Sequence, residues 1–444
     1  MRLKLTMLSA VLSAFFCTQV QATDLMDIYK EAFVRDPVVQ QLKASRDAAF
    51  ANLDEATASL LPQVDVTGSI TGTRTSANNG INANNRNSQA GVSLSQLIWS
   101  HGAWLNRTIA EKNAEKSELA YKDALQKLIL RVSQAYFNVL NAADVVSYNN
   151  ANNKALKNQL DEAVRRLQVG LIAETDRLEA QAAYDLSKAS VISAENNLMT
   201  SYEDLRTLTG RAVTIAELSE LDLSKFSTPA VQKTIQQLLK QAEGNNLTLQ
   251  QAVIDRDIAR DNITRAKSGH EPTVSLNAQA STGYTRYDHQ IPGSSQTTGN
   301  AWSESLGLGV NIPIYHGGAT SAQVEAAQAN YVAASQALEQ THRTLISDVN
   351  NGYNNVSAAI SSVNAFDLSV KSASSALNST TAGYEVGTRT MTDVLDATQK
   401  LYNAMQNAAA ARYQYIMSRL SLKYTGGDLK VEDLQSVNSG LKNR

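Results

Sequence analysis

The sequence predicts an α+β membrane protein in which strands form a β-barrel and long helices continue that barrel as a coiled coil. Two local patterns and one global pattern predict this class. Candidate strands alternate apolar and polar residues over about ten positions, as membrane barrel strands do. Proline-free stretches carry apolar residues at a 3,4 spacing, which is typical of coiled coils. The same order of elements then occurs twice along the chain.

Residues 1–22 are predicted to be a secretory signal peptide. Arg2 and Lys4 precede an apolar stretch, residues 5–16, which is too short to span a bilayer, and residues 20–22 resemble a cleavage site. The only cysteine, Cys17, lies inside this peptide. The mature chain is therefore expected to contain neither disulfides nor Cys-ligated metals.

Composition excludes several classes of function. The formal net charge of −2 offers no electrostatic footprint for nucleic acid. No run of 18 apolar residues follows the signal peptide, so we expect no membrane helix. The five histidines lack metal-ligand spacing. We therefore expect no metal, no cofactor and no nucleic-acid partner.

An internal repeat organises the chain. Matching residues recur without a gap 217 positions apart: Val169, Gly170, Thr175, Asp176, Leu178, Ala180 and Gly210 return as Val386, Gly387, Thr392, Asp393, Leu395, Ala397 and Gly427. Farther upstream the spacing is 210 positions. We predict repeat 1 over residues 23–228 and repeat 2 over residues 229–444. Residues 211–240 join the two, and with the C-terminal tail they are expected to form a small equatorial belt.

Two barrel strands are predicted in each repeat, at about 62–75 and 88–99 and at about 272–287 and 301–315. In the third, Val274 and Leu276 alternate with Ser275 and Asn277. A polar, loop-like insert separates each pair of strands, at 75–87 and 285–300. On this feature alone, a soluble sandwich remains an alternative.

Long coiled-coil helices follow each pair of strands. One predicted seam runs from Leu125 through Leu128 and Val132 to Leu167, and its twin runs from Leu345 to Tyr384. A helix from about Gly102 to Val169 would be on the order of 100 Å long.

Four strands cannot close a barrel, and open edges in lipid leave backbone groups unsatisfied. Three copies supply twelve strands, enough to leave a lumen. The sequence therefore predicts a homotrimer.

Several stretches resemble the outer membrane efflux protein family, the channel-tunnels of Gram-negative bacteria. They are 61–63 (LPQ), 135–142 (AYFNVLNA), 169–171 (VGL), 313–318 (PIYHGG), 384–390 (YEVGTRT) and 393–398 (DVLDAT). The resemblance covers about residues 24–434. It implies a trimeric conduit in the outer membrane, with a periplasmic helical barrel, that exports drugs, toxins or proteins in tripartite efflux and type I secretion. It also implies a periplasmic adaptor (membrane fusion) protein and an inner-membrane RND, ABC or MFS transporter as partners, with outer-membrane lipid around the barrel.

Two aspartates that follow the turn at Gly387, Asp393 and Asp396, suggest a functional site. Gly170 and Gly387 end the long helices as C-cap glycines, and Asp393 would cap the return helix with Asp396 at its third position. Asp176 and Glu179 repeat this pattern. The resemblance instead implies a cation-binding, selective ring of Asp393 and Asp396 at the periplasmic entrance, where mutual repulsion should raise some pKa values. The two roles are compatible, and whether Glu179 joins the ring is left open.

The resemblance also implies a latch that closes the entrance. Tyr384 and Arg389 would bond to Thr175 and Asp176 of the neighbouring helix pair, and the turns at Gly170 and Gly387 would form the adaptor docking region. Ordinary surface pairs worth roughly 0 to 1 kcal/mol are the alternative.

No set of groups indicates an enzyme. A trimeric coiled-coil surface adhesin with a β anchor is the alternative function, but the strand pairs embedded between helices argue against it.

Overall fold

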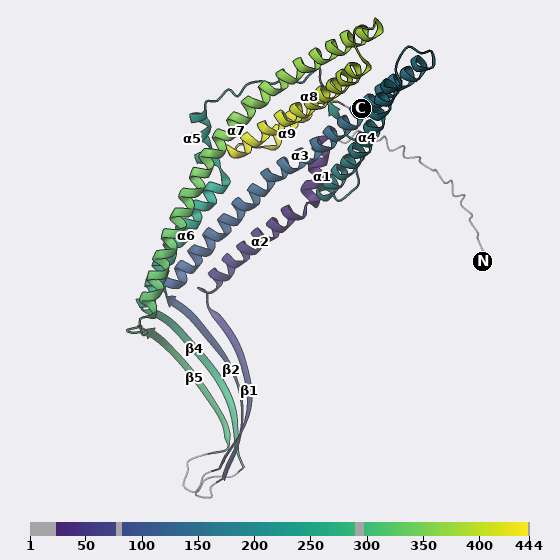
Figure 1. The fold of residues 1–444 in the computed structure, drawn as a ribbon. Helices are drawn as coiled ribbons and strands as arrows, with labels where there is room; N and C mark the ends of the chain where they lie inside the picture. The colour runs from purple at the N-terminus through teal and green to yellow at the C-terminus, as the bar shows by residue number, and fades with distance from the viewer. Residues whose placement is uncertain (1–23, 77–81, 289–296, 443–444) are drawn as a thin grey trace, which may run out of the picture.

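The computed structural model describes residues 24–76, 82–288 and 297–442. A four-stranded sheet forms one end of the elongated molecule, and helices extend from it to two hairpin tips at the opposite end (Figure 1). The predicted signal peptide and Cys17 lie outside the described residues.

The sheet is antiparallel, with the strand order β1-β2-β4-β5. Its strands are β1 (Gln63–Ser76), β2 (Asn82–Trp99), β4 (Thr273–Tyr287) and β5 (Gly299–Asn311). Two predicted bounds are wrong. β2 begins before residue 88 because its polar start pairs with a strand on each side, as Asn85 does with Thr73 and Tyr287. β5 ends before residue 315 because Pro313 has no N–H for the ladder.

Both edges of this sheet are open in one chain. β1 and β5 each pair with a single neighbour. Apolar side chains on these strands are solvent-exposed, including Val66 at 80%, Ile70 at 88% and Leu306 at 76%. A sheet with open edges and an exposed apolar face is incomplete until other strands join it.

Two short helices lead into each half. α1 (Leu25–Arg35) and α2 (Pro37–Ala58) meet at Asp36, and α5 (Ile235–Asn245) and α6 (Leu247–Lys267) meet at Asn246. The Asp36 carboxylate caps α2 by accepting the Val39 N–H at 2.9 Å. It also accepts two bonds from Arg131, at 2.8 and 3.0 Å. Because Asp36 is buried, this bidentate pair is what makes its charge tolerable.

The helices that follow the sheet are as long as the sequence predicts. α3 (His101–Gln168) has 68 residues and α7 (Ala319–Glu385) has 67, so each is roughly 100 Å long. α4 (Glu174–Thr209) and α8 (Met391–Thr425) return alongside them. The first half of each predicted seam is largely buried, at Leu128, Val132, Ala135 and Val139 in α3 and at Leu345, Val349, Val356, Ala359 and Val363 in α7. No helix among the described residues is both long enough and apolar enough to cross a bilayer.

The main core lies midway along the helices, where α1, α3, α8 and the C-terminal tail meet. Tyr136, Phe137 and Tyr415 are its largest fully buried side chains. Phe137 stacks on Tyr413 with ring centroids 5.7 Å apart. The Tyr136 hydroxyl donates to the Ser219 carbonyl at 2.8 Å, which satisfies the one polar group that this ring carries into the core.

The linker and the C-terminal tail are paired with each other, and together they are called the belt here. β3 (Glu220–Leu221) pairs with β6 (Leu441–Lys442), and α9 (Val431–Asn438) precedes β6. The Asn438 side chain accepts the Leu25 N–H at 3.0 Å, which ties the tail to α1. The belt therefore fastens both ends of the described chain to the middle of the helices.

Helices in the two halves of the chain begin at regular spacings. Upstream of the sheet, α1 begins at Leu25 and its counterpart α5 begins at Ile235. Beyond the hairpin turns, α4 begins at Glu174 and its counterpart α8 begins at Met391. The left-handed glycines at the ends of these last two helices, Gly210 and Gly427, keep the same spacing as the helix starts.

Replacing Gly427 by alanine is expected to lower the apparent melting temperature more than Gly170→Ala does. Both glycines have a left-handed φ, 69° and 75°, so both substitutions carry a backbone cost of roughly 1–2 kcal/mol. A Cβ on Gly427 would also lie 2.5 Å from the Asn245 carbonyl carbon, whereas one on Gly170 meets nothing within 4 Å. Thermal melts of both variants in one detergent measure the difference, and equal melting temperatures would contradict the expectation.

Candidate functional site

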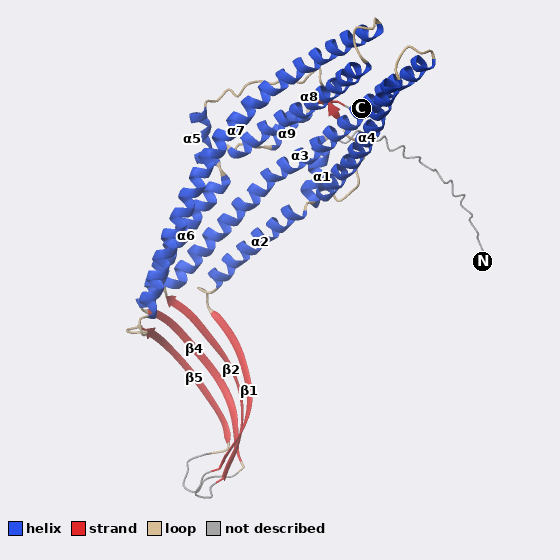
Figure 2. Cartoon of the chain, in the orientation of Figure 1, coloured by secondary structure: helices blue, strands red, loops and turns tan. Residues whose placement is uncertain are grey.

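The candidate site is the pair of helix turns at the end opposite the sheet (Figure 2). One turn joins α3 to α4 and the other joins α7 to α8. Gly170 and Gly387 occupy them with φ of 75° and 81°. The next amide bonds back to the helix in both, from Leu171 to Arg166 at 2.9 Å and from Thr388 to Gly383 at 2.8 Å. These are Schellman C-caps, which confirms the C-cap assignment of both glycines.

The return helices begin three residues earlier than predicted. Thr390, not Asp393, is the N-cap of α8, and Asp393 occupies the third helical position. The Thr390 hydroxyl accepts the Asp393 N–H at 3.2 Å, while the Asp393 carboxylate accepts the Thr390 N–H at 2.9 Å. This reciprocal capping box fixes the helix start. At the α4 start, Ala173 is the N-cap without a side-chain bond, so Asp176 is not a cap either.

Asp393 and Asp396 lie three residues apart on α8 and therefore on one face. The Thr390 N–H and, at 3.0 Å, the Thr390 hydroxyl both bond to Asp393. These bonds, the backbone one foremost, lower the pKa of Asp393 below its ordinary value. Asp396 is exposed, and no side chain in the described parts of the chain bonds to it. The Asp393 carboxylate is thus held in position by Thr390, and its ionised form is stabilised.

Tyr384 lies half-buried near the end of α7, against a small apolar cluster contributed by both hairpins. The Arg166 guanidinium lies over its ring, 4.7 Å from the centroid. Glu162 holds Arg166 by a bond of 2.7 Å. Burial raises the pKa of Tyr384, the Arg166 charge opposes this rise and Asp176 adds to it. The Tyr384 hydroxyl is buried and has no hydrogen-bond partner within the described chain.

The other predicted latch residues are near the turns but not joined within one chain. Thr175 and Asp176 lie in the first turn of α4. Arg389 folds back over Gly383, so that a Cβ there would lie 2.8 Å from the Arg389 Cγ. Among the described residues, no hydrogen bond or ion pair connects Tyr384 or Arg389 to Thr175 or Asp176.

Glu179 faces the other hairpin of its own chain. The Thr392 hydroxyl donates a hydrogen bond to the Glu179 carboxylate, which links the second turn of α4 to the first turn of α8. Farther from the tip, α3 and α8 are linked by polar side chains: Gln159 to Thr398 at 2.9 Å, Asn152 to Gln399 at 3.3 Å, Gln406 to Asn149 at 3.3 Å and Tyr413 to Asp144 at 2.7 Å.

The sequence does not reveal the contacts of Arg166, Glu162 and Thr392. Arg166 and Thr392 contact residues in the other half of the chain, Tyr384 and Glu179, and Glu162 lies one helical turn before Arg166. The polar seam positions, Asn149 among them, were a signal that the two hairpins meet through hydrogen bonds. In the portion of the chain that the structure covers, no group of three or more His, Cys, Asp or Glu side chains is placed to hold a metal ion.

Comparison with known proteins gives the family. The outer membrane efflux protein family matches residues 28–211 and 238–427. Outer membrane protein TolC of Escherichia coli strain K12 is 41% identical over 433 residues, covering 96% of this chain and 86% of the relative. The Vibrio cholerae TolC is 38% identical over 95% of both chains. The proteases secretion protein PrtF of Dickeya chrysanthemi is 26% identical over 98% of this chain and 95% of the relative.

Solved structures agree with this assignment at the level of the fold. CusC superposes with a TM-score of 0.78 at 17% identity, covering 91% of this chain and 92% of the other. The Campylobacter jejuni CmeC outer membrane channel gives 0.77 at 18% identity, covering 94% and 90%. The chain therefore belongs to the outer membrane efflux protein family.

Proposed function

We propose that three copies of this chain form a channel-tunnel that is gated at its helical tip. Each copy would contribute four strands to a twelve-stranded barrel in the outer membrane, and the hairpins would continue the conduit through the periplasm. The chain acts as an outer-membrane channel for efflux and type I secretion. The sheet supports the proposal of a trimer, because it has two open edges and exposed apolar side chains such as Val66 and Leu306.

The corresponding elements support a division into two repeats, residues 23–228 and 229–444, after a signal peptide of residues 1–22. Strand pairs placed between long helices in each half are unlike a single terminal anchor. The adhesin alternative is therefore not favoured, and neither the family nor its solved structures indicate an enzyme.

We assign the periplasmic entrance to the turns at Gly170 and Gly387. Threefold symmetry would turn Asp393 and Asp396 into rings of carboxylates that attract cations and determine selectivity. Glu179 is committed to Thr392, so it would tie the hairpins together rather than join this ring.

The unpartnered Tyr384 hydroxyl supports a latch to another copy. In a trimer, Thr175 and Asp176 of a neighbouring helix pair could accept bonds from Tyr384 and Arg389, which have no such partner in the described residues of one chain. Arg166 would hold the Tyr384 ring in position from within the same chain. Contacts of this kind are individually weak, so a partner could open them.

The partners we propose are a periplasmic adaptor protein, docked near the turns at Gly170 and Gly387, and an inner-membrane transporter of the RND, ABC or MFS class. Relatives named for efflux, such as BepC of Brucella suis, and for protease secretion, such as PrtF and AprF, support both branches of this export role.

Purified protein in planar bilayers is expected to form cation-selective pores that a trivalent cation blocks. In Asp393→Ala/Asp396→Ala the affinity of the blocking cation should fall by roughly tenfold or more, because the converging charges are gone. Pores with unchanged block would remove the carboxylates from the entrance, and absence of pores in the wild type would overturn the proposed function.

The cation block should depend on pH through Asp393. In Asp396→Asn, Asp393 is the remaining ring carboxylate. Because its pKa is lowered, it stays ionised at lower pH than an ordinary aspartate, whose pKa is about 3.9. Adding Thr390→Val removes the hydroxyl bond and should raise the pKa of Asp393. The block should then be lost at a higher pH than in Asp396→Asn alone. A shift toward lower pH, or none, would contradict the role of Thr390.

Tyr384→Phe/Arg389→Ser is expected to raise single-channel conductance, because the bonds proposed to close the entrance are removed. Arg343→Ser serves as the control, since Arg343 is an exposed residue of α7 that pairs with Glu339 at 2.7 Å. Equal conductance in the wild type and the double variant would reject the latch.

Arg166→Gln should raise the open probability of the pore by roughly two- to fivefold, which corresponds to losing a cation–π contact of about 0.5–1 kcal/mol. Arg165→Gln is a matched control: Arg165 binds the same Glu162 at 2.9 Å but is 67% exposed, against 27% for Arg166, and has no contact with Tyr384. The assignment fails if the two variants gate alike.

A further inference from the structure

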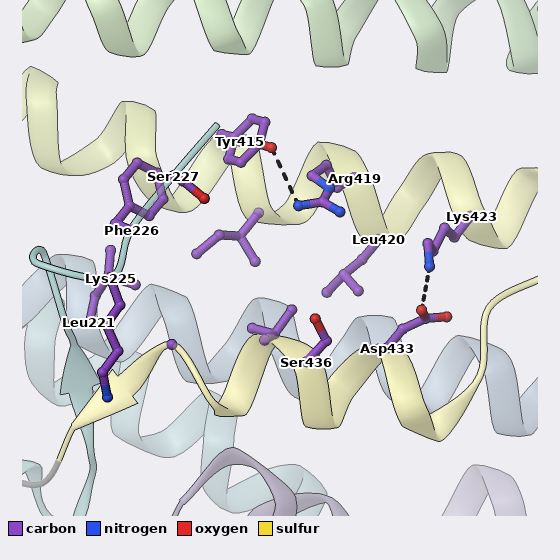
Figure 3. A pocket seen from close by; sticks show the side chains of 13 residues that line it. Leu221, Lys225, Phe226, Ser227, Tyr415, Arg419, Leu420, Lys423, Asp433 and Ser436 are labelled. Carbon is purple, nitrogen blue, oxygen red and sulfur yellow. Dashed lines mark hydrogen bonds and ion pairs between the residues drawn. The ribbon is translucent and has the colours of Figure 1, made fainter. Parts of the chain in front are cut away.

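A cavity of about 200 Å³ lies between α8, α9 and the linker segment 221–227, far from the helical tip. In Figure 3, Leu420 and Lys423 of α8 point toward Ser436 and Asp433 of α9 across this space, whereas Arg419 lies along α8 with its guanidinium beside Tyr415. Phe226 of the linker closes one end, edge-on to Tyr415 with ring centroids 6.0 Å apart. The cavity is thus built by the belt, a part of the chain with no role in the proposed gate.

Positive charge dominates the lining of the cavity. Three cations, Lys225, Arg419 and Lys423, line it together with a single carboxylate, Asp433. That carboxylate is already committed, because one oxygen pairs with Lys423 and the other accepts the Lys430 N–H at 3.0 Å. Lys225 pairs with Asp222, 3.6 Å away and outside the lining, so of the three cations only Arg419 has no carboxylate partner among the described residues.

Arg419 is the cation left without a counter-charge. In the described residues no carboxylate lies within 4 Å of its guanidinium. Its hydrogen bond to the Tyr415 hydroxyl is long, at 3.4 Å, and that hydroxyl donates its own proton to the Pro229 carbonyl at 3.0 Å. A guanidinium has five N–H donors, so most of those on Arg419 remain available to an acceptor.

The corresponding position in the first half indicates that helix packing does not require this charge. Tyr202 precedes Arg419 by the same spacing that separates Gly210 from Gly427. Its hydroxyl accepts the Ile215 N–H of the linker at 3.1 Å. At this position the first half thus has a neutral side chain that bonds to the linker, whereas the second half has a cation without a carboxylate partner beside a cavity.

Apolar side chains line the space beside Arg419, among them Ile416, Leu420 and Val437. Ile416 and Leu420 are already buried, and Val437 is half-buried. A carboxylate placed against Arg419 would form charge-assisted bonds, and an attached apolar group would pack against these side chains. Arg419 and Lys423 also line an adjoining cavity of about 370 Å³, so the charged rim is open to an approaching anion from two directions.

We propose that this cavity binds a small organic anion, with its carboxylate on Arg419 and its apolar body against Ile416, Leu420 and Val437. An inorganic anion would leave the apolar lining unused, and the volume suits a group of about the size of a bicyclic aromatic acid. The site is independent of the gate and of the pore.

The test titrates full-length trimer in a nonionic detergent with 2-naphthoate, followed by ligand-observed NMR, and repeats the titration with neutral 2-naphthylmethanol. Saturable naphthoate binding is expected, with the neutral alcohol and the Arg419→Gln variant each weaker by about tenfold or more. Arg343→Gln, which changes an exposed cation on α7, corrects for micelle and surface binding.

Equal affinity of Arg419→Gln for naphthoate, equal binding of the alcohol, or no saturable binding by the wild type would each overturn the proposal. A Ser436→Leu variant, designed to fill the cavity, should abolish binding without removing a charge. Pore conductance of Arg419→Gln is expected to equal that of the wild type. A failed anion site and a failed channel are therefore separate outcomes.

Discussion

The two open edges of the sheet are the constraint on which the rest of this structure depends. β1 and β5 each leave one row of backbone donors and acceptors unpaired, next to exposed apolar side chains such as Ile70. In a membrane, such groups cost several kcal/mol each unless other strands pair with them. In the proposed trimer the sheet would close with strands of further copies, and the helices that leave it would then form a closed wall as well. The incomplete sheet would thus determine the architecture at the far end of the molecule.

The two halves of the chain have the same order of elements, but their hairpins carry different side chains at corresponding positions. Both hairpins turn at a left-handed glycine, Gly170 or Gly387. Only the second has a capping box, built by Thr390 and Asp393, and only the second places a tyrosine where the first has Leu167. The first supplies Arg166, which lies over that tyrosine. A similar division is seen next to the belt, between Tyr202 of α4 and Arg419 of α8. The corresponding positions of the two halves are therefore complementary in their contacts.

Much of the fold could be predicted because it follows from periodicity. Strand alternation, heptad seams and the C-cap glycines are local, and the structure agrees with them. The misses have physical causes. β2 starts early because ladder partners on both sides override a polar composition, as at Asn85. The α8 cap was placed at Asp393 because an aspartate is a strong cap in isolation, whereas Thr390 and Asp393 bond reciprocally. In the candidate site, the sequence points to Asp393 and Tyr384 as candidates but gives no sign of Arg166, which contacts Tyr384 from another helix.

The sequence by itself determined the elements, their duplicated order, the glycine turns and the carboxylate pair on one face of α8, since each is set by residue type and spacing along a single helix or strand. Only the tertiary structure decided which side chains face one another: Arg166 over Tyr384, Glu179 on Thr392, and Arg419 beside a cavity without a counter-charge. The physical reason is that these contacts join residues on different helices or across the belt. Their geometry depends on the angle and offset at which whole helices pack, which no local pattern encodes.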